Sequence, residues 1–302
     1  MFQTGRIFLE WIKGLSLALG AAQFGQTYGI ANTAGRPSLS EIGEIVYFAR
    51  ESGITLLDTA IAYGESEARL GTVGMSAWQV VSKLPVVPEE GRKVLPWVQK
   101  AVRGSLERLK IDRLYGLLLH SPQQLLAPSG DILFRALCQL KSAGYVEKIG
   151  VSIYDPVELE VLCGRYQFDL VQSPFSLLDR RLLEGGWLGR LQRAGIELHV
   201  RSIFLQGLLL MEPGGRPGKF ERWVSIWNEQ AAWQRRHHLT PLEACTRYAL
   251  SFPEISKVVV GVESLKQLKE ILAAARGSVP ELPEAFSTAD VDLINPSRWS
   301  TL

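Results

Sequence analysis

Four polar residues of the chain have side chains that suit proton transfer to a reacting oxygen. Asp58, Lys83 and His120 each stand at the end of a short apolar run, and Tyr63 follows shortly after Asp58. A phenol has a pKa of about 10 and is a weak acid at neutral pH, but a nearby ammonium stabilises the phenolate. A carboxylate can orient that ammonium, and a histidine can share the proton or hydrogen-bond the oxygen. Together they predict a general-acid site for an oxygen that gains charge, as in carbonyl reduction.

The elements that must position these residues are eight short apolar runs, each followed by an amphipathic segment. Continuous apolar runs are typical of parallel strands that are covered on both faces. Helical periodicity lies between them, for example at Ile42, Ile45, Val46 and Ala49. The expected strands are Leu15–Leu19, Ile54–Leu57, Gln79–Ser82, Leu114–Leu119, Lys148–Val151, Leu170–Gln172, Ile196–Val200 and Lys257–Val260.

Eight such units predict an α/β fold, the closed (β/α)8 TIM barrel, whose strand C-terminal ends share one active-site face. An open doubly wound sheet is the alternative. It would require a glycine-rich phosphate turn after the first strand, and residues 20–25 lack the Gly-x-Gly-x-x-Gly spacing. Helix starts are expected at Ser40, Asp155-Pro156, Thr240-Pro241 and Ser264, and helix ends at Gly53, Gly144 and Gly195.

The chain is expected to form a single domain over residues 1–302, with a core of about 15–275. Residues 203–239 form a long insertion after the seventh strand, which in a barrel builds the active-site face or a lid. Residues 277–302 resemble a tail with a short helix at best. The apolar stretch Leu15–Ala22 is interpreted as the first strand and not as a secretory signal, since no clean cleavage pattern follows it.

Composition excludes several classes of protein. The 33 Lys and Arg residues nearly balance the 31 Asp and Glu residues, so we expect no basic face for nucleic acid. No stretch approaches the roughly 20 apolar residues of a membrane span. The three cysteines are far apart, which argues against a disulfide scaffold or a metal cluster and favours the cytoplasm.

Four blocks of the sequence resemble the aldo-keto reductase family, over roughly residues 15–275. The first block, which contains Asp58 and Tyr63, and the second, which ends in His120, are the most specific. The blocks are Leu57–Ala60 with Tyr63-Gly64, Glu67 and Leu70-Gly71; Ser105–Leu109 with Asp112 and Leu117–His120; Lys148–Ser152; and Val259–Val262 with Leu268 and Glu270.

The resemblance implies a barrel enzyme that reduces an aldehyde or ketone with NADP(H), with NAD(H) as the alternative cofactor. It assigns catalysis to Asp58, Tyr63, Lys83 and His120, with Tyr63 as the general acid. It places the nicotinamide carboxamide at Ser152 and Gln172. The pyrophosphate loop would be Ser202–Leu209, including Phe204, Leu205, Gln206 and Gly207, and the last strand and its helix would contribute Gly261, Glu263, Ser264, Lys266, Gln267 and Glu270.

Three positions depart from the pattern of the family. Ile153 replaces a usual Asn, and Arg201 stands where many members place an aromatic ring under the nicotinamide, with Phe204 as a substitute candidate. Glu263 stands where a cation often grips the ribose 2′-phosphate, with Lys266 and Lys269 near enough to compensate. We therefore expect both cofactors to be accepted, with a smaller preference for NADPH than relatives show.

Two other functions fit the same residues. A cofactor-binding regulatory subunit with little turnover would keep the fold, although the complete set of four polar residues argues for chemistry. A dedicated reductase of a sugar derivative would use the cofactor in biosynthesis, and Arg180, Arg181 and Arg201 could then face an anionic substrate.

Overall fold

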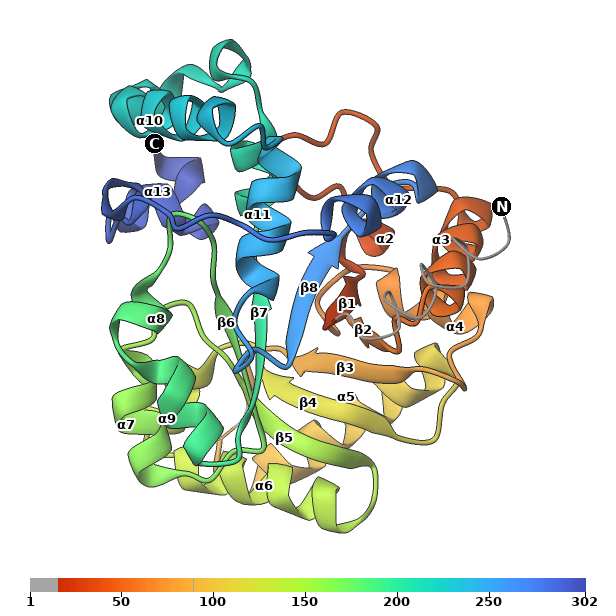
Figure 1. Cartoon of the computed structure of the whole chain (residues 1–302). Coiled ribbons are helices and arrows are strands. Elements are labelled where there is room, and N and C mark those ends of the chain that lie inside the picture. Colours follow the sequence, from red (N-terminus) through yellow and green to blue (C-terminus); the bar gives the residue numbers. More distant parts are fainter. Residues whose placement is uncertain (1–15, 89) are drawn as a thin grey trace.

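A closed barrel of eight parallel strands forms the centre of the computed structural model, which describes residues 16–88 and 90–302 (Figure 1). The predicted TIM barrel is confirmed, and each strand overlaps the run that predicted it; Leu15 lies outside the described residues. The strands are β1 (Leu17–Gly20), β2 (Leu56–Asp58), β3 (Gln79–Leu84), β4 (Leu114–Leu119), β5 (Val146–Ser152), β6 (Leu170–Pro174), β7 (Glu197–Arg201) and β8 (Lys257–Gly261).

Helices follow the strands and cover the barrel (Figure 1). The α-helices are α2 (Ala22–Gly25), α3 (Leu39–Glu51), α4 (Ser66–Val73), α5 (Val94–Leu109), α6 (Gly130–Ser142), α7 (Glu158–Arg165), α8 (Arg181–Glu184), α9 (Trp187–Arg193), α10 (Val224–Arg236), α11 (Pro241–Leu250), α12 (Leu265–Ala274) and α13 (Val291–Ile294). The 3-10 segments are η1 (Gly91–Lys93), η2 (Pro122–Leu126), η3 (Leu205–Leu210), η4 (Pro213–Gly215), η5 (Gly218–Trp223), η6 (Glu284–Phe286) and η7 (Pro296–Thr301).

Side-chain caps begin several of these helices. Thr240 and Glu243 form a capping box at α11, and the Ser264 hydroxyl accepts from the Gln267 amide at α12, as predicted. The prediction for α3 was wrong by two residues, because Ser38 and not Ser40 accepts from the Glu41 amide. Ser38 has the extended backbone that lets a side chain reach the first turn of a helix.

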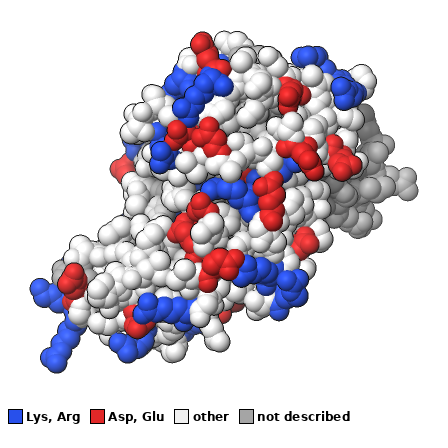
Figure 2. Space-filling view, turned by 90° about the vertical axis from the view of Figure 1, so that its left-hand side faces the viewer, with Lys and Arg blue, Asp and Glu red and all other residues white. Residues whose placement is uncertain are grey.

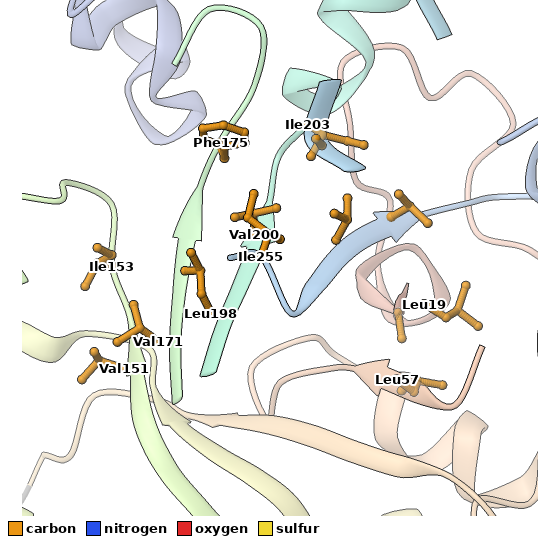
Figure 3. Close-up of a cluster of buried hydrophobic side chains, with 14 of the residues drawn as sticks. Leu19, Leu57, Val151, Ile153, Val171, Phe175, Leu198, Val200, Ile203 and Ile255 are labelled. Carbon is orange, nitrogen blue, oxygen red and sulfur yellow. The ribbon is translucent and has the colours of Figure 1, made fainter. Parts of the chain in front are cut away.

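The core has two layers because side chains alternate along each strand. One set fills the barrel interior: Ala18, Leu56, Val81, Leu118, Leu170 and Val259. The other set faces the helices and includes Leu19, Leu57, Val151, Val171, Leu198 and Val200, which Figure 3 shows around the strands. Two positions beyond each interior residue, toward the C-terminal end of its strand, the side chain points inward again. These positions hold Asp58, Lys83 and His120, three of the four predicted catalytic residues, together with Gln172 and Gly261.

The insertion after β7 and the C-terminal segment pack against each other beside the barrel. The Trp223 indole donates to Asp290 at 2.9 Å, and Phe220 meets Trp299 edge to face with ring centroids 5.0 Å apart. Figure 1 shows α10 and α13 on the same side of the molecule. The C-terminal segment, expected to be a tail with a short helix at best, contains the short helix α13 and packs into the core, where Trp299 is 3% exposed.

The face shown in Figure 2 carries charges of both signs, and the three cysteines are unpaired. Lys and Arg are interspersed with Asp and Glu over the face shown in Figure 2. Cys138, Cys163 and Cys245 are free thiols on three different helices. Among the described residues, no helix is both long and apolar enough to cross a membrane, and no cluster of side chains has the composition of a metal site.

Candidate functional site

Strand alternation brings the four predicted polar residues to one end of the barrel. Asp58 ends β2, two positions after Leu56, and Lys83 lies in β3, two positions after Val81. His120 directly follows β4, and its amide still donates to the Leu84 carbonyl at 3.0 Å, so the strand geometry continues to it.

Asp58 and Lys83 form a buried ion pair. The Lys83 ammonium donates to Asp58 Oδ1 at 2.5 Å and to the Thr59 carbonyl oxygen at 2.9 Å. Only 1% of the Lys83 side chain is exposed, so its charge depends on these partners. On the other side of the carboxylate, the Gln172 amide donates to Asp58 Oδ2 at 2.8 Å, and Ser152 donates to Gln172 Oε1 at 3.1 Å. The carboxylate is thus fixed by β3 and β6 together.

The aromatic ring of Tyr63 lies beside this ion pair. The Lys83 ammonium lies 5.1 Å from the centroid of the Tyr63 ring. The His120 ring packs against Tyr63 edge to face, with centroids 5.8 Å apart and planes at 80°. Tyr63 itself is carried by the turn after β2, where its amide donates to the Ala60 carbonyl at 3.0 Å. The structure thus places the four groups side by side, and among the described hydrogen bonds one joins two of them, from Lys83 to Asp58.

The electrostatics of the site keep Lys83 charged and His120 neutral. Burial lowers the pKa of Lys83, but the Asp58 charge and hydrogen bond outweigh burial, so that its pKa is raised above the ordinary value. Burial, together with the positive charges of Lys83 and Arg201, lowers the pKa of His120 from 6.5 to about 4. At neutral pH, His120 can therefore donate or accept a hydrogen bond as a neutral imidazole but carries no charge.

A cavity of about 440 Å³ begins at Asp58 and Tyr63 and runs across the strand ends to α12. Its walls come from the first loop, the segment after β7, and the β8–α12 region. The described residues that line it are Gly20, Ala21, Ala22, Gln23, Tyr28, Gly29, Ala31, Asp58, Tyr63, Arg201, Ser202, Ile203, Phe204, Gln206, Gly207, Leu210, Leu242, Val259, Gly261, Glu263, Gln267, Glu270 and Ile271. Of the four polar residues, Asp58 and Tyr63 line the cavity, and the β8–α12 region adds the carboxylates Glu263 and Glu270.

Most of the residues predicted to bind a cofactor line this cavity. They are Ser202, Phe204, Gln206, Gly207, Gly261, Glu263, Gln267 and Glu270. Leu205 is buried behind the wall, and Ser264 caps α12. The Lys266 side chain is 84% exposed and lies 3.8 Å from Glu270, outside the lining. Ser152 and Gln172 are buried beneath the cavity, where they support Asp58.

The segment after β7 has an unusual backbone. Ser202, Leu205, Gln206 and Gly207 have φ angles of +63°, +44°, +54° and +91°. Within this turn the Leu205 amide donates to the Ser202 carbonyl oxygen and the Gly207 amide donates to the Phe204 carbonyl oxygen, both at 2.9 Å. A Cβ atom at Gly207 would lie 2.5 Å from the Ala31 Cβ, so glycine is required for this loop to approach the first loop.

Two polar residues of the described lining were missed by the sequence reasoning. Tyr28 lies in the first loop, where burial raises the pKa of its phenol. Gln23, on α2, has a buried Oε1 atom without a hydrogen-bond partner in the described structure. The only signal for either was their position in the polar segment after the first strand, which is where barrels place active-site loops.

Arg180 and Arg181 were expected to face a substrate, and the structure corrects this expectation. Arg181 binds Asp179 and Asp155 at 2.8 and 3.0 Å. The Arg180 guanidinium donates to two carbonyl oxygens and lies over the Tyr248 ring, 5.6 Å from its centroid. Neither lines the cavity, because both hold the loop after β6 to its neighbours.

Comparison with known proteins identifies the family and supports the fold. The model of the Aldo/keto reductase family matches residues 16–285. The chain is 26% identical, over 75% of its length and 79% of the relative, to an uncharacterized oxidoreductase of Bacillus subtilis (strain 168). It is 25% identical, over 88% of its length and 91% of the relative, to a pyridoxal 4-dehydrogenase of Microbacterium luteolum. An aldo-keto reductase of Bacillus halodurans, solved in its holo form, superposes with a TM-score of 0.70, covering 94% of this chain and 95% of that one at 21% identity.

The fold and the site define a barrel oxidoreductase that reduces carbonyl groups of small molecules. The chain belongs to the aldo/keto reductase family. The relatives do not favour the alternatives of a regulatory subunit or of a reductase dedicated to a sugar derivative.

Proposed function

We propose that the chain reduces an aldehyde or ketone to an alcohol with a nicotinamide cofactor bound in the cavity, and that Tyr63 is the general acid. The observation that carries the proposal is the buried Asp58–Lys83 ion pair beside the Tyr63 ring, next to the cavity that Asp58 and Tyr63 line. A buried, paired ammonium next to a phenol has the arrangement that stabilises a phenolate.

The residues that line the cavity fit a dinucleotide. The unpartnered Gln23 Oε1 offers an acceptor inside the cavity, and a Cβ at Gly261 would lie 2.5 Å from it, so this wall needs glycine. The left-handed turn at Ser202–Gly207, most of which lines the cavity, would lie against the pyrophosphate. Glu263, Gln267 and Glu270 would hold the adenosine end, and Ser152 and Gln172 the carboxamide.

When bound, a reduced nicotinamide supplies a hydride to the carbonyl carbon. The protein has to supply a proton to the oxygen that gains the charge. In the proposed mechanism the Tyr63 hydroxyl donates that proton, and Lys83 stabilises the phenolate that remains. Asp58 keeps Lys83 charged and in place, and Gln172 orients Asp58. His120, neutral at the working pH, orients the carbonyl oxygen by a hydrogen bond and does not compete as a proton source.

The adenosine end of the cavity favours NAD(H) more than the family pattern suggests. Glu263 and Glu270 bring two carboxylates to this end, and a ribose 2′-hydroxyl can donate to a carboxylate, whereas a 2′-phosphate is repelled. Lys266 does not line the cavity, although its ammonium lies 3.8 Å from the Glu270 carboxylate, and the Lys269 ammonium lies 5.2 Å from the centroid of the Phe48 ring. We therefore propose that NAD(H) is used at least as well as NADP(H).

The test is an assay of NADH and NADPH oxidation with a panel of aldehydes, ketones and sugars. Two of the relatives are named a pyridoxal 4-dehydrogenase and an aflatoxin B1 aldehyde reductase, so aromatic aldehydes are included first. We expect aldehyde-dependent oxidation of the cofactor with a stoichiometric yield of alcohol. A protein that binds the cofactor but reduces none of the panel would contradict the proposal and favour a regulatory role.

We further propose that residues 1–302 act as a single domain and that the protein works in the cytoplasm. The free thiols of Cys138, Cys163 and Cys245 support a reducing compartment. Measuring the protein in fractions of its host cell tests the location, and a single cooperative unfolding transition tests the single domain.

A further inference from the structure

Arg201 brings a positive charge to the cavity. Among the described residues that line the cavity, it is the only Lys or Arg. It ends β7, two positions after the buried His199, so strand alternation directs it to the inside of the barrel end. The other charged side chains of the described lining are the carboxylates Asp58, Glu263 and Glu270.

The protein holds Arg201 firmly but does not neutralise it. Its guanidinium donates to the Ile153 carbonyl oxygen at 3.0 Å and to the Ser202 hydroxyl at 3.2 Å. It lies over the Tyr154 ring, 4.6 Å from the centroid. No ion pair joins it to a carboxylate in the described part of the chain. Arg181, on the same rim, is neutralised instead, because it forms ion pairs with two aspartates.

The guanidinium lies within electrostatic reach of the reacting end of the cavity. Its charge contributes to lowering the pKa of His120 and counteracts the effect of burial on the pKa of Tyr28. It also opposes the rise in the pKa of Lys83, whose charge is already balanced by Asp58. A half-buried guanidinium that is rigidly held, has spare N–H donors and lacks a counter-charge has the properties of an anion receptor.

We propose that Arg201 determines substrate specificity by binding a carboxylate of the substrate close to the carbonyl that is reduced. The inference rests on the proposed function and narrows its substrate class to oxo acids and carboxylated aldehydes. A single guanidinium without a second cation balances one negative charge, which fits a carboxylate better than a phosphate. The planar guanidinium can donate to both carboxylate oxygens side by side.

A matched pair of aldehydes tests the inference: 4-carboxybenzaldehyde, which is anionic, and methyl 4-formylbenzoate, which is neutral. We expect kcat/KM to favour the anionic aldehyde by about tenfold or more in the wild type. Arg201→Met should lower kcat/KM for the anionic aldehyde by about 10–100-fold and change the neutral one little, and Arg201→Lys should recover part of the loss. Arg135→Gln, on the exposed side of α6, changes the net charge equally and should change neither.

A second measurement shows whether Arg201 binds the carboxylate of a substrate or the diphosphate of the cofactor. The dissociation constants of NADH and NAD⁺ are measured by quenching of tryptophan fluorescence in the wild type and in Arg201→Met. Unchanged cofactor affinity, with loss of the anionic aldehyde alone, supports the inference. Weakened cofactor binding with an equal loss for both aldehydes would overturn it, because Arg201 would then serve the cofactor.

Direct binding makes the inference independent of turnover. Benzoate and benzamide are titrated into the protein by calorimetry, with Arg201→Met beside the wild type. If benzoate binds more tightly than benzamide and its binding is lost in Arg201→Met, the inference is supported. This holds even if neither aldehyde is reduced, because a lack of reduction would contradict only the proposed function. Equal affinity for the two compounds in the wild type would overturn the inference.

Discussion

The rings of Tyr63 and His120 meet edge to face, with centroids 5.8 Å apart, although the two residues come from different strand ends. The contact limits the rotation of the tyrosine ring and places the imidazole beside it. Lys83 approaches the same ring, 5.1 Å from its centroid. The tyrosine is therefore held between a neutral imidazole and a charged ammonium, and each neighbour leads to a separate prediction.

Tyr63→Phe removes the proposed proton donor and leaves the ring in place. We expect turnover to fall by about 10²–10⁴-fold, the usual contribution of a positioned general acid. The affinity for NADH should stay within about twofold of the wild type, because the hydroxyl is not needed to bind the cofactor. The measurements are kcat with an aldehyde substrate and a fluorescence titration of NADH. Wild-type turnover in the variant would show that another group supplies the proton.

Lys83→Met removes the charge beside the Tyr63 ring and leaves a side chain of similar length. Tyr63 then becomes a weaker acid, so kcat should fall by about 10²-fold or more. The variant also leaves the Asp58 carboxylate buried without its ion-pair partner, which costs stability. Asp58→Asn/Lys83→Met, which removes both charges, serves as the control for folding. An unchanged rate and pH profile in Lys83→Met would contradict the activation of Tyr63.

His120 makes stability depend on pH. Its pKa is about 4 in the folded protein against 6.5 ordinarily, so between these values the unfolded chain binds a proton that the folded chain does not. The stabilisation from a neutral His120 is thus fully present above pH 6.5 and is lost as pH falls toward 4, by about 1–3 kcal/mol. Urea unfolding at several pH values should show this loss in the wild type and a smaller one in His120→Asn. Parallel curves for the two proteins would contradict it.

Glu67, on the helix that follows Tyr63, carries a buried carboxylate that binds residues of β3 and α5. It is 1% exposed and accepts from Ser82 at 2.7 Å, from Ser105 at 2.6 Å and from Arg108 at 2.7 Å. Because Ser82 adjoins Lys83, the network fixes α4 and α5 to the strand that carries the ammonium. Glu67→Ala should lower the free energy of unfolding by about 2–4 kcal/mol, since it leaves buried donors and the Arg108 charge without a partner. Ser105→Ala removes only one of the donors, so it should lower the free energy of unfolding by less. Negligible losses of this free energy in both variants, measured by urea titration, would contradict the role of Glu67.

The barrel and most of the polar site could be predicted from the sequence because both follow from short-range periodicity. Apolar runs mark strands that are buried on both faces, and a polar residue at the end of such a run must lie at the active-site face. This argument located Asp58, Lys83 and His120. The same alternation explains Gln172, although its bond to Asp58 depends on β6 lying opposite β2 across the barrel.

What could not be predicted depends on contacts between distant segments. Tyr28 and Gln23 line the cavity only because the first loop folds back over the strand ends. Arg181 and Arg201 look alike in the sequence, yet Arg181 binds two aspartates, whereas Arg201 lines the cavity and forms no ion pair in the described part of the chain. Short-range patterns carry no information about such partners.

The adenosine end of the cavity gives the last prediction. The Glu263 backbone amide donates to Gln267 Oε1 at 2.7 Å, and the Gln267 amide donates back to the carboxylate at 3.5 Å, so α12 holds Glu263 at the wall. A carboxylate here accepts from a ribose 2′-hydroxyl and repels a 2′-phosphate. Glu263→Arg reverses the charge and should shift the ratio of NADPH to NADH affinity toward NADPH by about 5–30-fold. Fluorescence titrations of both cofactors measure the ratio, with Lys266→Gln, outside the lining, as the control for an exposed charge. A wild type with a strong preference for NADPH that Glu263→Arg leaves unaltered would mean that the ribose binds elsewhere than at Glu263.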